Sequence, residues 1–270
     1  SNPSTQRTDG AVQSPPWPAM GPTPDQIQYM PWVNEIPTFR CPSDPGRGLP
    51  ALGRTNYGAC MGDSIWQLHY GPYNNNRTTI TNGRARQARD AHRGFFMPLQ
   101  VSKFRDTLDG DKRGNSVATN GGNSGPFGLA ALRRNPNICT DRGYVDPERP
   151  QFWLPEFQQQ NRRNFARGHR WADYLPLMSG VLTILPPNRE ACGRYNALGT
   201  TLVATVSSRH QGGAHVLMGD GAVRFVTDSI EAGNSNAQNI WQNNVPGSAS
   251  PYGLWGALGT RASKETTEEF

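Results

Sequence analysis

Glycine and proline are spread along the whole chain, and they limit what it can fold into. Glycine contributes 30 residues and proline 23, so the two occupy 53 of 270 positions. That is about a fifth, against a usual ~12 %. Both residues interrupt long helices and favour turns, and residues of the AVILMFWYC set reach only 35 %. The sequence therefore excludes a helical bundle or coiled coil and predicts many turns around a modest, β-rich core.

The longest apolar-leaning run covers residues 174–185 and is interrupted by Pro176, Gly180 and Thr183. It falls short of the ~18 consecutive apolar residues that a membrane-spanning helix needs. The sequence opens on polar residues, without the pattern of a secretion signal. We expect no membrane span in this segment, and we expect the sequence to begin within a longer protein.

The positive charge of the chain is carried almost entirely by arginine. There are 27 Lys and Arg against 21 Asp and Glu, a formal net charge of +6, and the lysines are Lys103, Lys112 and Lys264. The arginines are scattered, and they are not interleaved with aromatic stacking residues as in nucleic-acid-binding modules. We therefore expect solvated arginines in loops and no nucleic-acid partner.

The four cysteines, Cys41, Cys60, Cys139 and Cys192, show no C-x-x-C spacing, which disfavours a zinc ribbon or a thioredoxin-like site. Two disulfides in an exported protein fit better. Of three connectivities we predict Cys41–Cys60, which closes a turn-rich loop, together with Cys139–Cys192. Closing a loop of about twenty residues contributes ~3 kcal/mol in the chain-entropy model. The alternative is four buried reduced thiols.

Composition divides the chain into three parts. Residues 1–22 are rich in Pro, Ser, Gln and Gly and are predicted to form an extended arm. Residues 23–232 form the globular domain. Residues 233–270 are a polar tail that docks through the aromatic residues of segment 252–255, and its end from Lys264 is expected to be disordered.

Local signals predict several shorter elements before the last third of the chain. They are a helix over 23–30 ended by Pro31, an extended strand over 36–40, a surface loop over 74–93, a buried strand over 93–97, a long irregular excursion over 109–137, and a helix over 155–168.

Three strand signals follow, over 202–206, 214–218 and 222–226. The last two are separated by Asp220 between two glycines, which can adopt positive φ, so they predict a tight hairpin. Alternate residues of a strand face opposite ways, and one side of this hairpin is predicted to be exposed.

A signature spans this hairpin. His210 precedes Asp220 by ten residues, with Gly212 and Gly213 after the histidine and Gly221 after the aspartate. Strand rise puts the hairpin tip ~15 Å from its start, so the histidine and the aspartate are not expected to touch. We predict a structural role, in which Asp220 accepts backbone N–H bonds in an Asx turn and His210 bonds to neighbouring backbone or a loop.

Asp106, Asp109, Asp111 and Asn115 place three carboxylates and one amide within one glycine-bearing loop. Hard oxygen ligands at such spacing can bind Ca²⁺, although the closing glutamate of an EF-hand is missing. The alternative is a solvated loop with Asx turns. No other cofactor is predicted.

The sequence contains no G-x-S-x-G nucleophile elbow and no dinucleotide or phosphate loop. The two predicted disulfides leave no thiol for a cysteine nucleophile. We assign no catalytic residue.

Seven segments run in order along the chain: 39–45 (FRCPSDP), 55–57 (TNY), 93–96 (RGFF), 170–173 (RWAD), 185–188 (LPPN), 207–230, and 250–261 (SPYGLWGALGTR). Together they resemble a bacterial family of type IV prepilin-like (pseudopilin-like) proteins of unknown function that end in an H-x9-D-G signature. The family's D-G-[ST]-S-N-T segment is represented only by residues 109–115.

This resemblance implies an exported protein, located in the periplasm, on the cell surface or outside the cell. It implies a precursor with a leader and a long apolar helix, which is missing here and which would join the protein to other pilin-like subunits. The segment alone is then expected to be a monomer or a weak oligomer. No enzymatic activity is implied, whereas related pseudopilins bind calcium in loops beside their sheet.

We therefore expect an α+β, pilin-like fold with a mainly antiparallel β-sheet, long irregular loop insertions and few short helices. The expected function is structural and non-enzymatic, as a subunit or surface element of a cell-surface or secretion-related assembly. The alternative is an extracellular carbohydrate-binding module or hydrolase. The two differ in whether Trp66, Tyr70, Trp153 and Trp171 line one pocket or are buried separately.

Overall fold

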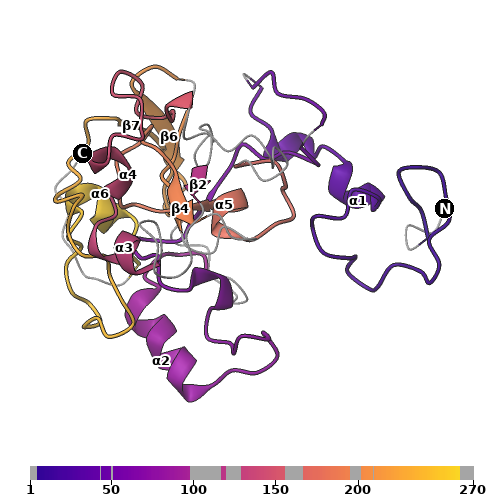
Figure 1. Ribbon diagram of the computed structural model, residues 1–270, viewed down its shortest axis with the longest axis horizontal. Coiled ribbons are helices and arrows are strands. Elements are labelled where there is room, and N and C mark those ends of the chain that lie inside the picture. The colour runs from indigo at the N-terminus through magenta and orange to yellow at the C-terminus, as the bar shows by residue number, and fades with distance from the viewer. Residues whose placement is uncertain are drawn as a thin grey trace.

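The computed structural model describes residues 5–42, 44–49, 51–97, 117–119, 129–155, 167–194, 202–208 and 210–261. Short helices and small sheets are joined by long loops, which confirms the predicted α+β class (Figure 1). In the part of the chain so described, none of the helices has the length and apolar character needed to cross a membrane.

The helices are short, as the frequent glycines and prolines require. They are α1 (Met30–Val33), the 3₁₀-helix η1 (Pro37–Phe39), the 3₁₀-helix η2 (Leu68–Tyr70), α2 (Asn82–Ala91), α3 (Leu129–Arg134), α4 (Ile138–Asp141), α5 (Pro176–Ser179) and α6 (Gly253–Leu258).

The strands are β1 (Ala59–Cys60), β2 (Val117–Thr119), β3 (Gly180–Val181), β4 (Cys192–Arg194), β5 (Leu202–Val203), β6 (Gly213–Leu217) and β7 (Val223–Thr227). They pair in three small sheets, of order β1-β3, β2-β4-β5 and β6-β7. The expected antiparallel pairing is found in β4–β5 and β6–β7, whereas β1–β3 and β2–β4 pair in parallel.

The apolar-leaning run of the sequence is the centre of the core. Val181 in β3 packs with β6, β7 and α6, whereas Leu182, Ile184 and Leu185 pack with the residues around α4 and β4. The same short segment therefore contributes to both main hydrophobic clusters, and its backbone binds neighbours on either side. Leu182 donates its N–H to Ala204 O and Thr183 donates to Gly62 O.

Three elements predicted from local signals differ in the structure. The helix predicted over 23–30 is not formed, because residues 23–29 lie in turns and extended chain and the helix begins only at Met30. Pro31, expected to end that helix, lies in the first turn of α1, where the missing N–H of proline costs no hydrogen bond. Segment 36–40, predicted as a strand, contains the 3₁₀-helix η1. Segment 93–97, also predicted as a strand, has no strand pairing, although Phe96 donates its N–H to Cys60 O at 3.0 Å.

Helix α2 lies in a segment predicted as a surface loop. Thr81 caps it by accepting the N–H of Arg84 at 3.4 Å, and its buried residues are Ala88 and Ala91. Because it buries small alanines rather than an apolar stripe, it has no periodic signal for sequence analysis to detect. The predicted helix over 155–168 lies mostly outside the described residues.

The N-terminal segment is joined to the rest of the chain by aromatic rings. Trp17 contacts Tyr29 edge-on, Tyr29 contacts Trp32, and Trp32 contacts Trp171, at centroid distances of 5.6, 5.1 and 5.5 Å. Figure 1 shows this segment, with α1, projecting to one side of the body. Trp171 therefore forms the bridge between the N-terminal segment and the segment before α5.

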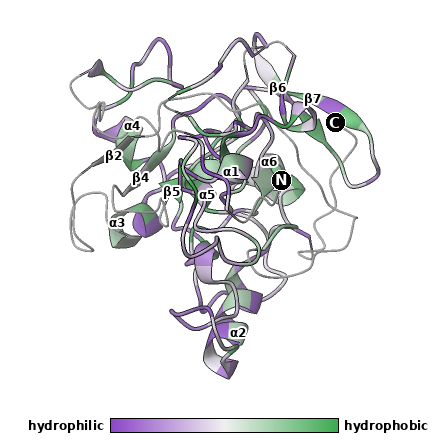
Figure 2. Ribbon diagram, turned by 90° about the vertical axis from the view of Figure 1, so that its right-hand side faces the viewer, coloured by the Kyte–Doolittle hydropathy of each residue, from purple (hydrophilic) through white to green (hydrophobic). Residues whose placement is uncertain are grey.

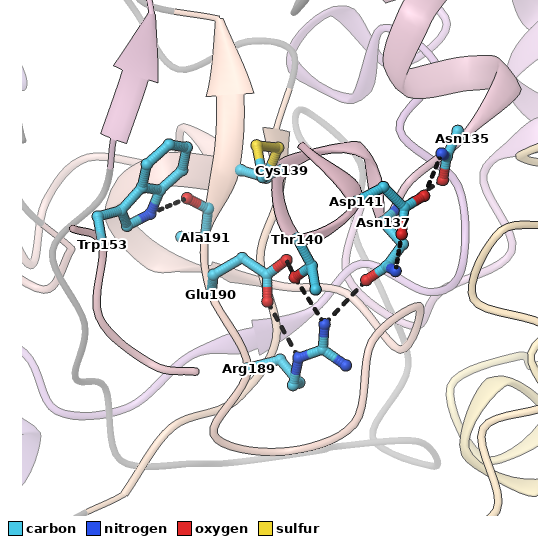
Figure 3. Close-up of a disulfide and its surroundings, with 10 residues drawn as sticks. Asn135, Asn137, Cys139, Thr140, Asp141, Trp153, Arg189, Glu190 and Ala191 are labelled. Carbon is cyan, nitrogen blue, oxygen red and sulfur yellow. Dashed lines mark hydrogen bonds and ion pairs between the residues drawn. A yellow bond between two sulfur atoms is a disulfide. The ribbon is translucent and has the colours of Figure 1, made fainter. Parts of the chain in front are cut away.

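One of the two predicted disulfides is present. Cys139 in α4 and Cys192 in β4 are bonded, both fully buried, across a sequence separation of 53 (Figure 3). The bond fixes a helix against the central strand of the three-stranded sheet.

The other predicted disulfide, Cys41–Cys60, is not formed, and the assignment was wrong. Cys60 is buried in β1, where its Sγ lies 3.7 Å from Gly259 O. Cys41 lies in a half-buried loop, where its N–H donates to Asn56 Oδ1 at 2.9 Å. Proximity in the sequence does not bring the two thiols together, because tertiary packing directs Cys60 toward the C-terminal segment.

Loss of the Cys139–Cys192 bond should destabilise the fold strongly. The double variant Cys139→Ala/Cys192→Ala is expected to lose about 4 kcal/mol of unfolding free energy, because the bond closes a long loop in the unfolded chain. Urea unfolding measures this loss, and Cys41→Ala is the control, expected to change it by less than about 0.5 kcal/mol. A different pairing in unreduced peptide maps, or no loss of stability, would contradict the assignment.

Candidate functional site: the C-terminal hairpin

The H-x9-D-G signature lies on the hairpin of β6 and β7. The strands pair antiparallel, with Gly213 opposite Thr227 and Leu217 opposite Val223. At the tip, Gly221 adopts a φ of 89°, and Asp220 Oδ1 accepts the N–H of Ala222 at 2.8 Å. This is the Asx-type bond that the sequence predicts, and it gives Asp220 the role of shaping the turn.

The base of the hairpin is closed by Asn188, a residue that sequence analysis did not single out. Its Oδ1 accepts the N–H of Ser208 at 2.7 Å, and its Nδ2 donates to Asp228 Oδ1 at 2.7 Å. Asn188 has a φ of 58°, a left-handed conformation that asparagine tolerates better than most residues. The available signal was the segment 185–188, which the resemblance includes without giving it a role.

His210 belongs to this base. Its backbone N–H donates to Ser208 Oγ at 3.0 Å, and Gly212 accepts the N–H of Asp228 at 2.9 Å. At Gly213 a Cβ would overlap the carbonyl oxygen of Val226, so the close approach of the two strands requires glycine. His210 and Asp220 therefore lie at opposite ends of the hairpin and do not form a catalytic or metal-binding pair.

The two faces of the hairpin differ. Ala214, Val216 and Val226 are buried against the body. On the other face the ring of His215 contacts His210 at 4.8 Å and Phe225 at 5.1 Å. Phe225 is 45 % exposed and Val223 64 %. The hairpin therefore presents histidine and apolar side chains to solvent, as its alternating pattern predicts.

A polar cluster lies beside the disulfide, and its groups bind one another (Figure 3). Buried Glu190 accepts from Thr140 Oγ1 at 2.6 Å and from Arg189 Nε at 3.0 Å. Asp141 accepts side-chain amides, from Asn137 at 2.8 Å and Asn236 at 2.5 Å. Because protein donors already bind these carboxylates, the cluster is suited to holding segments together.

No metal centre is found in the described part of the chain, where no group of three or more His, Cys, Asp or Glu side chains could hold an ion. The calcium candidate, Asp106, Asp109, Asp111 and Asn115, lies outside the described residues.

The C-terminal segment is held by a buried ion pair that sequence analysis also missed. Arg93 Nε donates to Asp63 Oδ1 at 2.9 Å, and Arg93 Nη2 donates to Asp63 Oδ2. Ser250 Oγ donates to Asp63 Oδ2 at 2.7 Å, and Arg93 Nη1 donates to Ser248 O. The pair thus binds the loop that leads into α6.

The chain matches the model of one known protein family. A family model described as "Protein of unknown function (DUF1559)" matches residues 4–233. The chain belongs to this family. No curated protein and no solved structure matches it.

The large aromatic residues of this DUF1559 chain lie in separate environments. Trp153 is buried and donates to Ala191 O at 3.3 Å, whereas Trp66 packs on Trp241 with centroids 4.1 Å apart. Trp171 contacts the N-terminal segment, and Tyr70 lies beneath arginine side chains. They contribute to packing at four places rather than to one aromatic surface.

Two histidines of this DUF1559 chain are core residues rather than acid–base groups. Burial lowers the pKa of His92 to about 4, and its Nε2 lies 2.6 Å from Trp66 O. Because a carbonyl can only accept, the neutral ring carries its proton on Nε2. Burial likewise lowers the pKa of His69 to about 4, with a further contribution from nearby arginines. Both rings are neutral at pH 7.

If the signature is structural, changes at Asp220 should affect stability alone. Asp220→Ala is expected to cost about 1 kcal/mol of unfolding free energy, because the Asx-type bond at the tip is lost. Asp220→Asn is the matched control, since its side-chain oxygen can still accept the same N–H. Thermal unfolding of both variants measures the difference. Loss of a metal-binding or catalytic activity at an unchanged melting temperature would overturn this role.

Proposed function

We propose that this DUF1559 chain is a structural, non-enzymatic domain of an exported, pilin-like protein, and that it serves as a subunit or surface element of a cell-surface or secretion-related assembly. The proposal rests first on the resemblance of seven ordered segments to prepilin-like proteins. The disulfide adds support, because such bonds persist in oxidising compartments.

The observation that carries the proposal is that the signature residues form a hairpin rather than a catalytic or metal-binding site. Gly213 and Asp220 shape the hairpin, and the backbone N–H of His210 bonds to Ser208 at its base. The hairpin exposes Val223 and Phe225 on its outer face. A hairpin that packs one face on the body and exposes apolar side chains on the other is suited to contact with another protein. The separate packing of the tryptophans favours this function over a hydrolase or an aromatic sugar-binding surface.

In this proposal, assembly depends on an apolar N-terminal helix of the precursor, whose burial against other subunits supplies the main cohesion. The globular domain then lies on the outside of the assembly. The segment alone remains a monomer or a weak oligomer, because contacts between such domains are small.

Location in the cell tests this function directly. Antibodies raised against the 270-residue chain should label intact cells of the organism that encodes it, and protease added outside should remove the signal. A cytoplasmic chaperone serves as the control that must survive the protease. Recovery of the protein only in the cytoplasm, with both cysteines of the Cys139–Cys192 pair reduced, would contradict the proposal.

A further inference from the structure

A polar pocket lies away from the hairpin, in a lobe formed by residues 71–91. Figures 1 and 2 show α2 extending from the body in this lobe. The pocket has a volume of about 460 Å³. Its lining consists of Asn74, Asn75, Asn76, Thr81 and Arg84. Amides, a hydroxyl and a guanidinium thus form the wall, with no carboxylate among them.

The lobe is strongly basic. It carries four arginines, at positions 77, 84, 86 and 89, and one acidic residue, Asp90. Asp90 lies 3.9 Å from Arg89 Nε and so offsets a charge on the helix rather than one at the pocket. Within the described ranges, neither Arg77 nor Arg84 forms an ion pair with a carboxylate.

Arg84, which lines the pocket, and Arg77, in the loop before α2, are held in place by neutral groups. Arg84 donates to Asn75 Oδ1 at 2.7 Å, and its Cζ lies 5.3 Å from the centroid of the Tyr70 ring. Arg77 Cζ lies 5.9 Å from the Tyr70 centroid and 5.4 Å from that of Tyr174. Cation–π contacts of this kind position a guanidinium without neutralising it, so the positive charge is available to a ligand.

The pKa of His69 agrees with positive charge on Arg77 and Arg84. His69, whose ring lies 3.8 Å from that of Tyr70, has its pKa lowered by burial first and then by the charges of Arg77 and Arg84. Arg77 and Arg84 thus act on the buried His69 ring as positive charges.

We propose that this pocket binds the carboxylate or sulfate group of an acidic sugar. The planar guanidinium of Arg84 matches such oxyanions, which it can bind through two parallel N–H bonds. The Asn74 amide is bound to Thr78, whereas the amide N–H groups of Asn75, the amide of Asn76 and the hydroxyl proton of Thr81 are suited to the neighbouring sugar hydroxyls. A single-stranded nucleic acid fits less well, because it needs exposed aromatic faces for stacking, and guanidinium groups cover the Tyr70 ring.

Binding of a sulfated disaccharide derived from heparin tests the proposal, with titration calorimetry as the measurement and uncharged cellobiose as the comparison. The wild-type chain should bind the sulfated sugar saturably. Cellobiose should bind at least about tenfold more weakly, because a tenfold change in Kd corresponds to only 1.4 kcal/mol of binding free energy. Arg84→Gln should weaken binding by about tenfold, and Arg84→Lys, which keeps the charge but loses the planar fork, by less.

Arg89→Gln is the matched control. It removes the same charge from the same helix, but the Arg89 side chain is 70 % exposed and lies outside the pocket. Its affinity should stay within about twofold of wild type, because exposed charges contribute little. Absence of saturable binding by the wild type, or equal weakening by Arg84→Gln and Arg89→Gln at unchanged melting temperatures, would overturn the site. Tighter binding of a single-stranded oligonucleotide than of the sulfated sugar would overturn the ligand class.

Discussion

The rest of the structure depends on the ion pair between Asp63 and Arg93, which forms where two backbone segments cross. Asp63 follows Gly62 and Arg93 precedes Gly94, and a Cβ on either glycine would overlap the opposite backbone. The glycines therefore permit an approach that no larger residue would allow. Desolvating two charges is costly, and such a pair stabilises a fold only when further hydrogen bonds satisfy both partners. Here Ser250 and the carbonyl of Ser248 supply them.

The same crossing attaches the C-terminal segment. Arg261 donates its N–H to Arg93 O at 2.9 Å, and Asn239 Nδ2 donates to Tyr252 OH at 3.0 Å. Trp255, fully buried, donates to Leu185 O at 2.8 Å and packs in the cluster that contains the buried face of the hairpin. The ion pair thus fixes the segment on which the hairpin rests. The outward direction of the exposed hairpin face follows from this packing.

The features that could be predicted from the sequence are those that local signals determine. The hairpin followed from two β-rich runs around a glycine-flanked aspartate, and the Asx-type bond of Asp220 followed from the chemistry of short carboxylates. The bond between Cys139 and Cys192 was also predicted. Helix α2 was missed because its alanines and its Thr81 cap give no periodic apolar pattern.

Long-range contacts could not be predicted in the same way. The Asp63–Arg93 pair joins residues 30 positions apart, and nothing in either local sequence specifies the partner. The one available hint is that each charge stands beside a glycine. Cys60 was assigned to Cys41 because the two bracket a loop, but the docking of α6 and the residues after it places Cys60 against Gly259 instead. The pocket in the α2 lobe likewise depends on a helix that the sequence did not reveal.

A double-mutant cycle on this ion pair tests the account most directly, with unfolding free energies measured for Asp63→Asn, Arg93→Gln and the double variant. Each single variant should lose on the order of 3–5 kcal/mol, because it leaves a buried partner unpaired. The double variant should lose far less than the sum of the two. In all three, the amide protons of α6 should exchange faster than in the wild type. Single losses below about 0.5 kcal/mol, which are typical of surface sites, or strictly additive losses would show that the fold does not depend on this pair.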